Sequence, residues 1–236
     1  MKKSLISLVK LVLCVVIIMF AEVYYFDFLA LIGINVDKLE SFTVQLLLLF
    51  LYVVMGFAVY TVYKDRIKGD FFRFKRKWFP NTLMSIMFFA GFTIGIWALN
   101  YVMNLLASSL DTYYVGLAFH NIFTSDVDID FIFKSIIMVP FITTTVYIIG
   151  VGDLVSSKKK HIILSGLLAI LVTGLNLIGE NLHGDVLYIV LNVIPYFVIY
   201  AGLTYIYREN NENIWFSLMT IVLYALFASL IIERIT

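Results

Sequence analysis

The sequence predicts an all-α, polytopic membrane protein: a helical bundle of about seven transmembrane helices that forms one domain over residues 1–236. Apolar residues make up 62% of the chain and charged residues only 14%. A soluble domain could not bury so large an apolar fraction, because its surface has to carry polar side chains. The apolar residues also gather in seven stretches, and the loops between them alternate between basic and acidic. These observations indicate a bilayer environment.

The seven stretches have the lengths expected of membrane-spanning helices, since a hydrocarbon core about 30 Å thick is crossed by about 20 helical residues. The expected spans are 5–26, 41–63, 82–107, 131–150, 162–178, 186–207 and 214–232. Strands are not expected, because polar and apolar positions do not alternate and backbone groups in lipid must be satisfied within a helix. Each loop is too short to fold alone.

Basic residues predict the orientation of these spans. If the spans alternate in direction, 13 of the 17 Lys and Arg residues fall on one side: Lys2, Lys3, Lys64, Arg66, Lys68, Arg73, Lys75, Arg76, Lys77, Lys158, Lys159, Lys160 and Arg208. Lys38, Lys134 and Arg234 fall on the other side, and Lys10 lies within the first span. Basic loops stay in the cytoplasm. The N-terminus is therefore expected inside and the C-terminus outside.

The first span begins like a signal peptide, with a basic start and an apolar run. No small-x-small cleavage site follows, so an uncleaved helix is expected. Cys14, the only cysteine, lies within this span. The sequence therefore predicts neither a disulfide nor a thiolate metal site.

The segment KDRIKGDFFRFKRK at 64–77 is the largest feature of the basic side. Its cations are Lys64, Arg66, Lys68, Arg73, Lys75, Arg76 and Lys77, and aromatic residues are interleaved with them. This pattern is typical of an ordinary positive-inside loop, and it also suits an interfacial segment that binds anionic lipid or a partner.

Two groups of residues on the opposite side suggest a candidate divalent-cation site. The longest such loop contains His120, Asp126, Asp128 and Asp130, and a second loop contains Glu180 and His183 at one-turn spacing. The alternative reading is that these are solvated loop residues. No metal and no other cofactor are expected.

Polar residues inside the spans are almost all neutral. Asn100, Thr143, Thr144, Thr173 and Asn176 are of the kind that joins membrane helices by hydrogen bonds. No carboxylate lies deep enough in a span to activate water, and no proton relay or buried charge pair is apparent.

Three segments near the C-terminus, VPFITTTVYIIG, ILSGLLAILVTGL and GLTYIYRENNENIWFSLMTIVLYALFASL, resemble the layout of the CAAX protease and bacteriocin-processing family, also called CPBP or Abi. The similarity implies an Abi-like core over about 80–232. Family members carry a Glu-Glu pair, two histidines and an asparagine on these helices for intramembrane peptide cleavage. Aligned on Pro140, Ser165 and Ile214-Trp215, those positions are Thr143, Thr144, Thr173, Ile221 and Ala225 in this chain.

None of these replacements can serve as a carboxylate ligand or as a base near neutral pH. The resemblance therefore implies a pseudoprotease: a non-catalytic protein of the bacterial cytoplasmic membrane that scaffolds or regulates another membrane or cell-envelope protein. Candidate residues for a partner-binding groove are Thr143, Thr144, Thr173, Asn176 and Ile221.

Other functions remain open from the sequence. Bacteriocin self-immunity would use the same fold, and a small-solute transporter is weakened by the few internal polar positions and the lack of inverted repeats. An active metalloprotease would require His120, Glu180 and His183 to form a new site. The expected partners are the lipid bilayer and another membrane or envelope protein. Nucleic acid is not expected as a partner.

Overall fold

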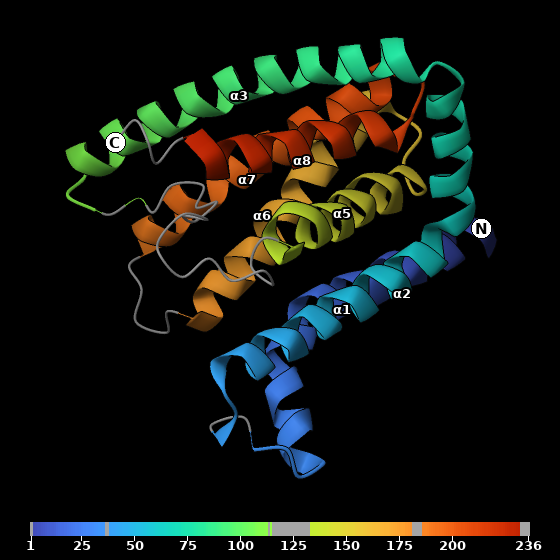
Figure 1. Ribbon diagram of the computed structural model, residues 1–236. Helices are drawn as coiled ribbons and strands as arrows, with labels where there is room; N and C mark the ends of the chain where they lie inside the picture. Colours follow the sequence, from blue (N-terminus) through green and yellow to red (C-terminus); the bar gives the residue numbers. More distant parts are fainter. Residues whose placement is uncertain (1, 36–37, 113, 115–132, 181–185, 232–236) are drawn as a thin grey trace.

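The computed structural model describes residues 2–35, 38–112, 114, 133–180 and 186–231. Regular secondary structure in these residues is helical, which confirms the predicted all-α class. The helices are α1 (Lys2–Leu31), α2 (Ser41–Arg76), α3 (Trp78–Ser109), α5 (Val139–Thr144), α6 (Lys158–Glu180), α7 (Val186–Glu209) and α8 (Ile214–Ile231). The π-helical turns η2 (Phe133–Met138) and η3 (Thr145–Gly150) precede and follow α5 (Figure 1).

Each predicted apolar stretch corresponds to one continuous helical segment, with α5 and its two π-helical turns counted together. Among the described residues, four helices, α1, α2, α3 and α7, are long and apolar enough to cross a membrane. The apolar segments Ile136–Gly150 and Ile214–Phe227 are shorter. The chain thus has the helices of a membrane protein, while seven crossings and the orientation of the termini stay predictions.

The main departure from the expected boundaries is in α2. The backbone leaves helical geometry at Tyr63 (φ −111°, ψ 15°), where the predicted span ends, and then resumes as a helix to Arg76. This second part, which we call the cross-helix (residues 64–76), runs across one end of the bundle as the upright segment on the right of Figure 1. The basic segment is therefore helical rather than a loop.

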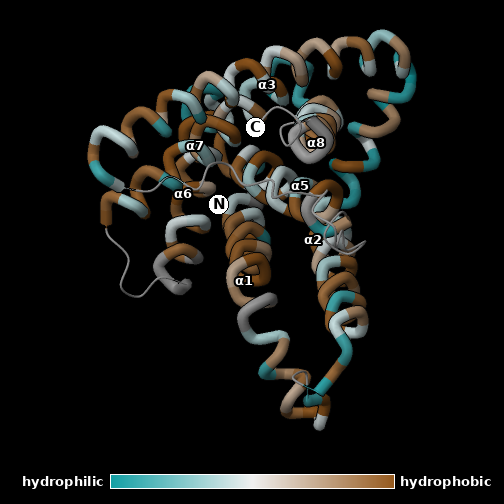
Figure 2. Tube along the Cα trace, turned by 60° about the vertical axis from the view of Figure 1, so that its left-hand side comes forward, coloured by the Kyte–Doolittle hydropathy of each residue, from teal (hydrophilic) through white to brown (hydrophobic). Residues whose placement is uncertain are grey.

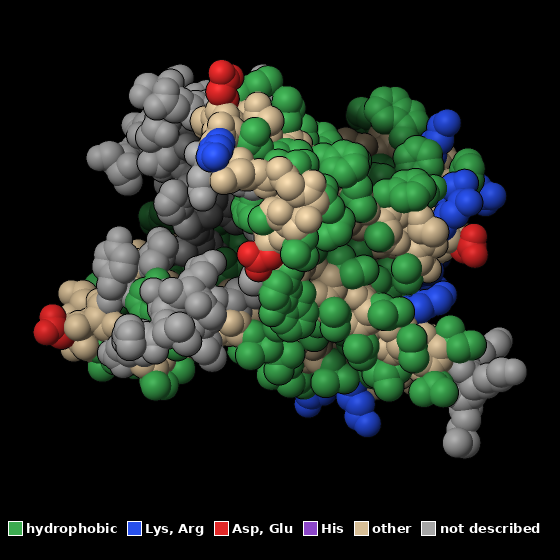
Figure 3. All heavy atoms as spheres, turned by 90° about the horizontal axis from the view of Figure 1, so that it is seen from below, with side chains coloured by type: hydrophobic (Ala, Val, Ile, Leu, Met, Phe, Trp, Pro, Cys, Tyr) green, Lys and Arg blue, Asp and Glu red, His purple; other side chains and the backbone are tan. Residues whose placement is uncertain are grey.

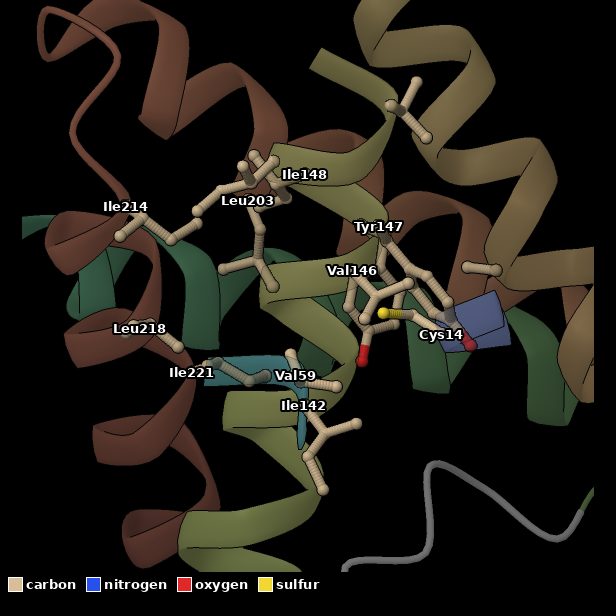
Figure 4. Packing of buried hydrophobic residues seen from close by; sticks show 14 of the residues in the cluster. Cys14, Val59, Ile142, Val146, Tyr147, Ile148, Leu203, Ile214, Leu218 and Ile221 are labelled. Carbon is tan, nitrogen blue, oxygen red and sulfur yellow. The ribbon is translucent and has the colours of Figure 1, made fainter. Parts of the chain in front are cut away.

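The core lies between α5 with η3, α6, α7 and α8, and α1 and α2 pack on one side of it. Figure 4 shows Ile142 near Val59 of α2 and Ile221 of α8, and Val146 near Cys14 of α1. α1 and α2 lie side by side and point away from the other helices at their connected end (Figure 2).

α3 lies along the outside of α7 and α8 (Figure 1). Its inner face is an aromatic row, in which Phe88, Phe89 and Phe92 pack against Phe216, Phe227 and Tyr224 of α8, respectively, with ring centroids 6.3, 5.5 and 5.6 Å apart. Edge-to-face aromatic pairs fix helix separation in an environment where apolar contact alone is not selective. The opposite face of α3 is free of other described helices.

Candidate functional site

Two threonines of the sequence-predicted groove, Thr143 and Thr144, lie at the end of α5. Thr143 donates a hydrogen bond to the Val139 carbonyl (2.7 Å) and accepts one from the Tyr200 hydroxyl of α7 (2.6 Å). Thr144 and the next residue, Thr145, are fully buried, and neither hydroxyl has a hydrogen-bond partner in the described structure. Thr143 thus joins two helices, whereas Thr144 lies in the packed interior.

The other groove candidates come from α6 and α8. Thr173 is half-buried. Ile221 is only 3% exposed and packs in the central core, close to Ala225, which is fully buried. Asn176 lies on α6, but its side chain is outside the description. Because Thr144 and Ile221 are enclosed by neighbouring helices, this set does not line an open surface.

The side chains of the external cation candidates lie outside the part of the chain that the structure describes. His120 and His183 lie outside the described residues, and Glu180 is the last residue of α6 with its side chain outside the description. Among the residues that are described, no group of three or more His, Cys, Asp or Glu side chains is close enough to hold a metal ion.

A polar arrangement that the sequence did not suggest lies where η3 meets α6. A π-helical turn is too wide for regular i to i+4 bonding, so some of its carbonyls need other donors. Ser165 donates to the Tyr147 carbonyl (2.8 Å), and His161, one turn earlier on α6, donates from Nε2 to the Ile148 carbonyl (2.8 Å). Both side chains are fully buried. One face of α6 therefore satisfies the backbone of η3.

The same histidine continues into a charged network at this end of the bundle. Its Nδ1 accepts a hydrogen bond from Nε of Arg208 (2.7 Å). Arg208 also pairs with Glu212 and donates to the Val155 carbonyl. The second oxygen of Glu212 accepts from Arg66 of the cross-helix (2.8 Å). We call His161, Arg208, Glu212 and Arg66 the end network.

Protonation in the end network follows from burial and charge. The pKa of His161 is lowered to about 4, mainly by burial; the hydrogen bond to the Ile148 carbonyl opposes this shift, and the charge of the adjacent Arg208 adds to it. Burial alone would raise the pKa of Glu212, but the hydrogen bond from Arg66 and the charges of Arg208 and Arg66 keep it below its usual value. The neutral imidazole has both nitrogens engaged and the carboxylate has two guanidinium partners, an arrangement suited to holding helices together.

A second contact set joins the cross-helix to the start of α8. Asp70, which is buried, accepts a hydrogen bond from the Ile214 backbone N–H (3.0 Å) and pairs with Arg73. Arg73 also donates to the carbonyls of Asn211 and Glu212, both of which have a positive φ. Left-handed backbone is unfavourable for residues other than glycine. The arginine therefore stabilises a strained α7–α8 turn.

The free face of α3 carries two glycines one turn apart. Gly91 and Gly95 are exposed, and a Cβ built on either would meet nothing within 4 Å. Ala98 continues the same edge of the helix and is also exposed. The spacing Gly-x-x-x-Gly allows the backbone of another transmembrane helix to approach closely.

Comparison with protein-family models, with characterised proteins and with solved structures finds no match to this chain.

Sequence reasoning missed the end network and the α3 glycines for different reasons. The Gly91-x-x-x-Gly95 pattern is readable from the sequence, but only the structure shows which face of α3 is free. His161 directly follows three lysines in the sequence, a pattern that is typical of a solvated basic loop. Its one-turn spacing to Ser165 was the available signal, although the carbonyls that both side chains satisfy are set by the π-helical turn.

Proposed function

We propose that this protein is a non-catalytic scaffold of the bacterial cytoplasmic membrane that holds a partner membrane protein through the free face of α3. The observation that carries the proposal is the open pair Gly91 and Gly95. In lipid, helices associate through close backbone approach and van der Waals packing, and small residues at four-residue spacing favour this. The aromatic row on the opposite face of α3 holds the helix against α8, so the glycine face is presented on a fixed support.

The interior supports a non-catalytic role. A general base needs a free lone pair at a suitable pKa. In the end network, His161 uses both ring nitrogens and Glu212 is neutralised by Arg66 and Arg208. Asp70 is occupied by Arg73 and by the first N–H of α8. These ionisable groups have structural partners in place of a substrate.

The partner site on α3 replaces the groove expected from the sequence. Thr144 and Ile221 are buried, so a partner helix would have to separate α5 from α8 to reach them. α3 offers a contact that needs no rearrangement. We retain the family resemblance as part of the proposal: Pro140 lies at the start of α5, Ser165 satisfies η3, and Trp215 donates its ring N–H to the Ile67 carbonyl (3.2 Å).

The proposed orientation places the end network in the cytoplasm. Ion pairs connect the cross-helix, the start of α6 and the end of α7: Arg66–Glu212, Arg208–Glu212 and Lys158–Glu209. Three separate basic segments thus meet at one end of the bundle. This agrees with the cytoplasmic location expected of positively charged loops.

The experiment is affinity purification from native membranes in mild detergent, followed by mass spectrometry of co-purifying proteins. We expect a stoichiometric membrane partner with the native protein and a loss of at least about tenfold in its recovery with Gly91→Ile or Gly95→Ile. Ala90→Ile is the matched control, because Ala90 is exposed at the same depth but lies about 100° around the helix from Gly91. Equal recovery with all variants, or recovery of this protein alone, would contradict the proposal.

A further inference from the structure

We propose that one edge of the cross-helix, formed by Lys64, Lys68 and Lys75, binds the headgroups of anionic phospholipids in the leaflet at this end of the bundle. The inference is separate from the α3 partner site and rests only on the chain lying in a membrane. It follows from how five of the six cations of this helix, all except Arg76, divide between two opposite edges.

One edge is committed to the protein. Arg66 donates to Glu212 and to the Tyr207 hydroxyl, and Arg73 donates to the carbonyls of the α7–α8 turn and pairs with Asp70. At 100° per residue these two arginines lie within about 20° of each other around the helix. The edge with Arg66 and Arg73 therefore faces the turn that precedes α8.

The other edge carries three lysines without such partners. Lys64, Lys68 and Lys75 are exposed, and no hydrogen bond or ion pair joins them to another described residue. They lie within about 40° of each other around the helix and about 160° from the arginine edge, in a row about 16 Å long. Three ammonium groups in a line are thus left for an external anion.

The lysine edge faces the membrane side of the cross-helix. Phe71, which lies next to it around the helix, stacks against Trp215 with ring centroids 5.2 Å apart. Trp215 is the second residue of α8, an apolar helix that runs away from the α7–α8 turn. The arginine edge contacts the α7–α8 turn, whereas Phe71, beside the lysine edge, contacts α8 itself. The lysine edge therefore lies on the side of the cross-helix at which α8 enters the bilayer.

Exposed aromatic rings accompany the lysines. Phe71 and Phe72 are 41% and 61% exposed, and Trp78 follows at the start of α3, also exposed. Figure 3 shows hydrophobic side chains over most of the described part of one face, with Lys and Arg side chains mainly at its right-hand end and lower edge. Cations beside rings at the membrane interface bind anionic lipid by combining phosphate attraction with insertion of the rings.

The occupant we assign is a phospholipid with net negative charge. A zwitterionic headgroup would place its own cation among the ammonium groups, which is unfavourable. An acidic protein segment would satisfy the charges but would leave Phe71 and Phe72 exposed to lipid without a role. Asp65, the residue after Lys64, is exposed but lies about 100° further around the helix, so its carboxylate does not interrupt the row of lysines.

The test uses the tryptophans as reporters of the neighbouring lipid. The protein, in a Trp97→Phe background that leaves Trp78 and Trp215 near the cross-helix, is reconstituted into nanodiscs containing brominated phosphatidylglycerol or brominated phosphatidylcholine. We expect brominated phosphatidylglycerol to quench the tryptophan fluorescence at least about threefold more strongly than brominated phosphatidylcholine at equal content. In Lys64→Gln/Lys68→Gln/Lys75→Gln the two lipids should quench equally.

The matched control, Lys38→Gln/Lys159→Gln/Lys160→Gln, removes the same charge from exposed lysines elsewhere and should keep the preference. If the triple variant of the edge does not fold, the single variants should each lower the preference in part. A preference unchanged in the edge variants would overturn the proposal. Loss of the preference for phosphatidylglycerol on adding inorganic phosphate, beyond the effect of chloride at the same ionic strength, would also overturn it and would indicate a free-anion site. Loss of the preference on adding polyglutamate would overturn it as well and would indicate an acidic-protein site.

Discussion

Asp70 on the cross-helix accepts a hydrogen bond from the backbone N–H of Ile214, 144 residues later in the chain, and so caps the first turn of α8 from another helix. The Asn213 side chain completes the cap by accepting from the Trp215 N–H (3.1 Å) and donating to the Asp70 carbonyl (3.1 Å). The unpaired N–H groups at a helix start need acceptors, most of all where the helix start is buried. The cap therefore ties the position of the cross-helix to that of α8.

Asp70→Ala is expected to lower the stability of the protein by about 2–4 kcal/mol, because it removes the cap and leaves Arg73 without its carboxylate partner. Asp65→Ala, an exposed aspartate on the same helix, is the control and should change stability by less than about 0.5 kcal/mol. Thermal unfolding in detergent, followed by tryptophan fluorescence, measures both. Equal melting temperatures for the two variants would show that the cap contributes little.

The end network makes stability depend on pH. The pKa of His161 is about 4 in the folded protein, against its usual 6.5. Between these values the unfolded chain binds a proton that the folded protein does not, so stability should fall as the pH drops from about 6.5 to 4. The lowered pKa of Glu212 acts in the same direction, since its contribution is lost when the carboxylate is protonated.

We expect the loss from His161 to be roughly 2 kcal/mol, once the nearby solvent at the bundle end is allowed for. His161→Gln keeps an N–H donor for the Ile148 carbonyl and an acceptor for Arg208 but does not titrate. Its melting temperature should therefore be flatter between pH 6.5 and 4 than that of the native protein. Parallel pH profiles for the two proteins would rule out His161 as the source.

Two glycines on α6 make a matched pair for the contact with α7. A Cβ at Gly166 would lie 2.6 Å from Cδ2 of Phe197, whereas a Cβ at Gly174 would lie 3.6 Å from Val193, an ordinary van der Waals distance. Gly166→Ala should therefore destabilise the protein by about 1–3 kcal/mol through displacement of the Phe197 ring.

Gly174→Ala should be neutral or slightly stabilising, by up to about 1 kcal/mol, because alanine favours helix over glycine. Unfolding by a denaturing detergent, read out by circular dichroism, compares the two. If Gly166→Ala were as stable as Gly174→Ala, the α6–α7 contact would have to be looser than the structure shows.

The sequence predicted the helical segments well because apolar length and charge at the ends are local properties. The end of the second predicted span coincides with the irregular backbone at Tyr63. What followed was mistaken for a loop, since KDRIKGDFFRFKRK is too polar for a span. Its helical form depends on Ile67, Asp70 and Phe74 being buried against α7 and α8, a tertiary contact that periodicity alone did not reveal.

The candidate site was harder to predict than the helices. Alignment to a family pattern placed Thr144 and Ile221 in a groove, but their exposure depends on how α5 and α8 approach each other. Similarly, nothing in the sequence indicates a π-helical turn, so the freed carbonyls of Tyr147 and Ile148 and their partners on α6 could not be expected. Polar groups satisfied by distant backbone are the part of a membrane bundle that single-sequence patterns predict least.

The hydrogen bond from Tyr200 to Thr143 tests how much a neutral polar contact contributes inside the bundle. Tyr200→Phe removes the donor and leaves Thr143 bonded to the Val139 carbonyl, so no buried group loses its only partner. We expect destabilisation of about 1 kcal/mol, since such contacts in membrane proteins average roughly 0.6 kcal/mol. A double-mutant cycle with Thr143→Val isolates the energy of the Tyr200–Thr143 hydrogen bond. The double variant should lose less stability than the sum of the two single variants, by roughly 0.6 kcal/mol. Additive losses would mean that the hydroxyl of Tyr200 contributes through other contacts, and that α5 and α7 are held together by apolar packing alone.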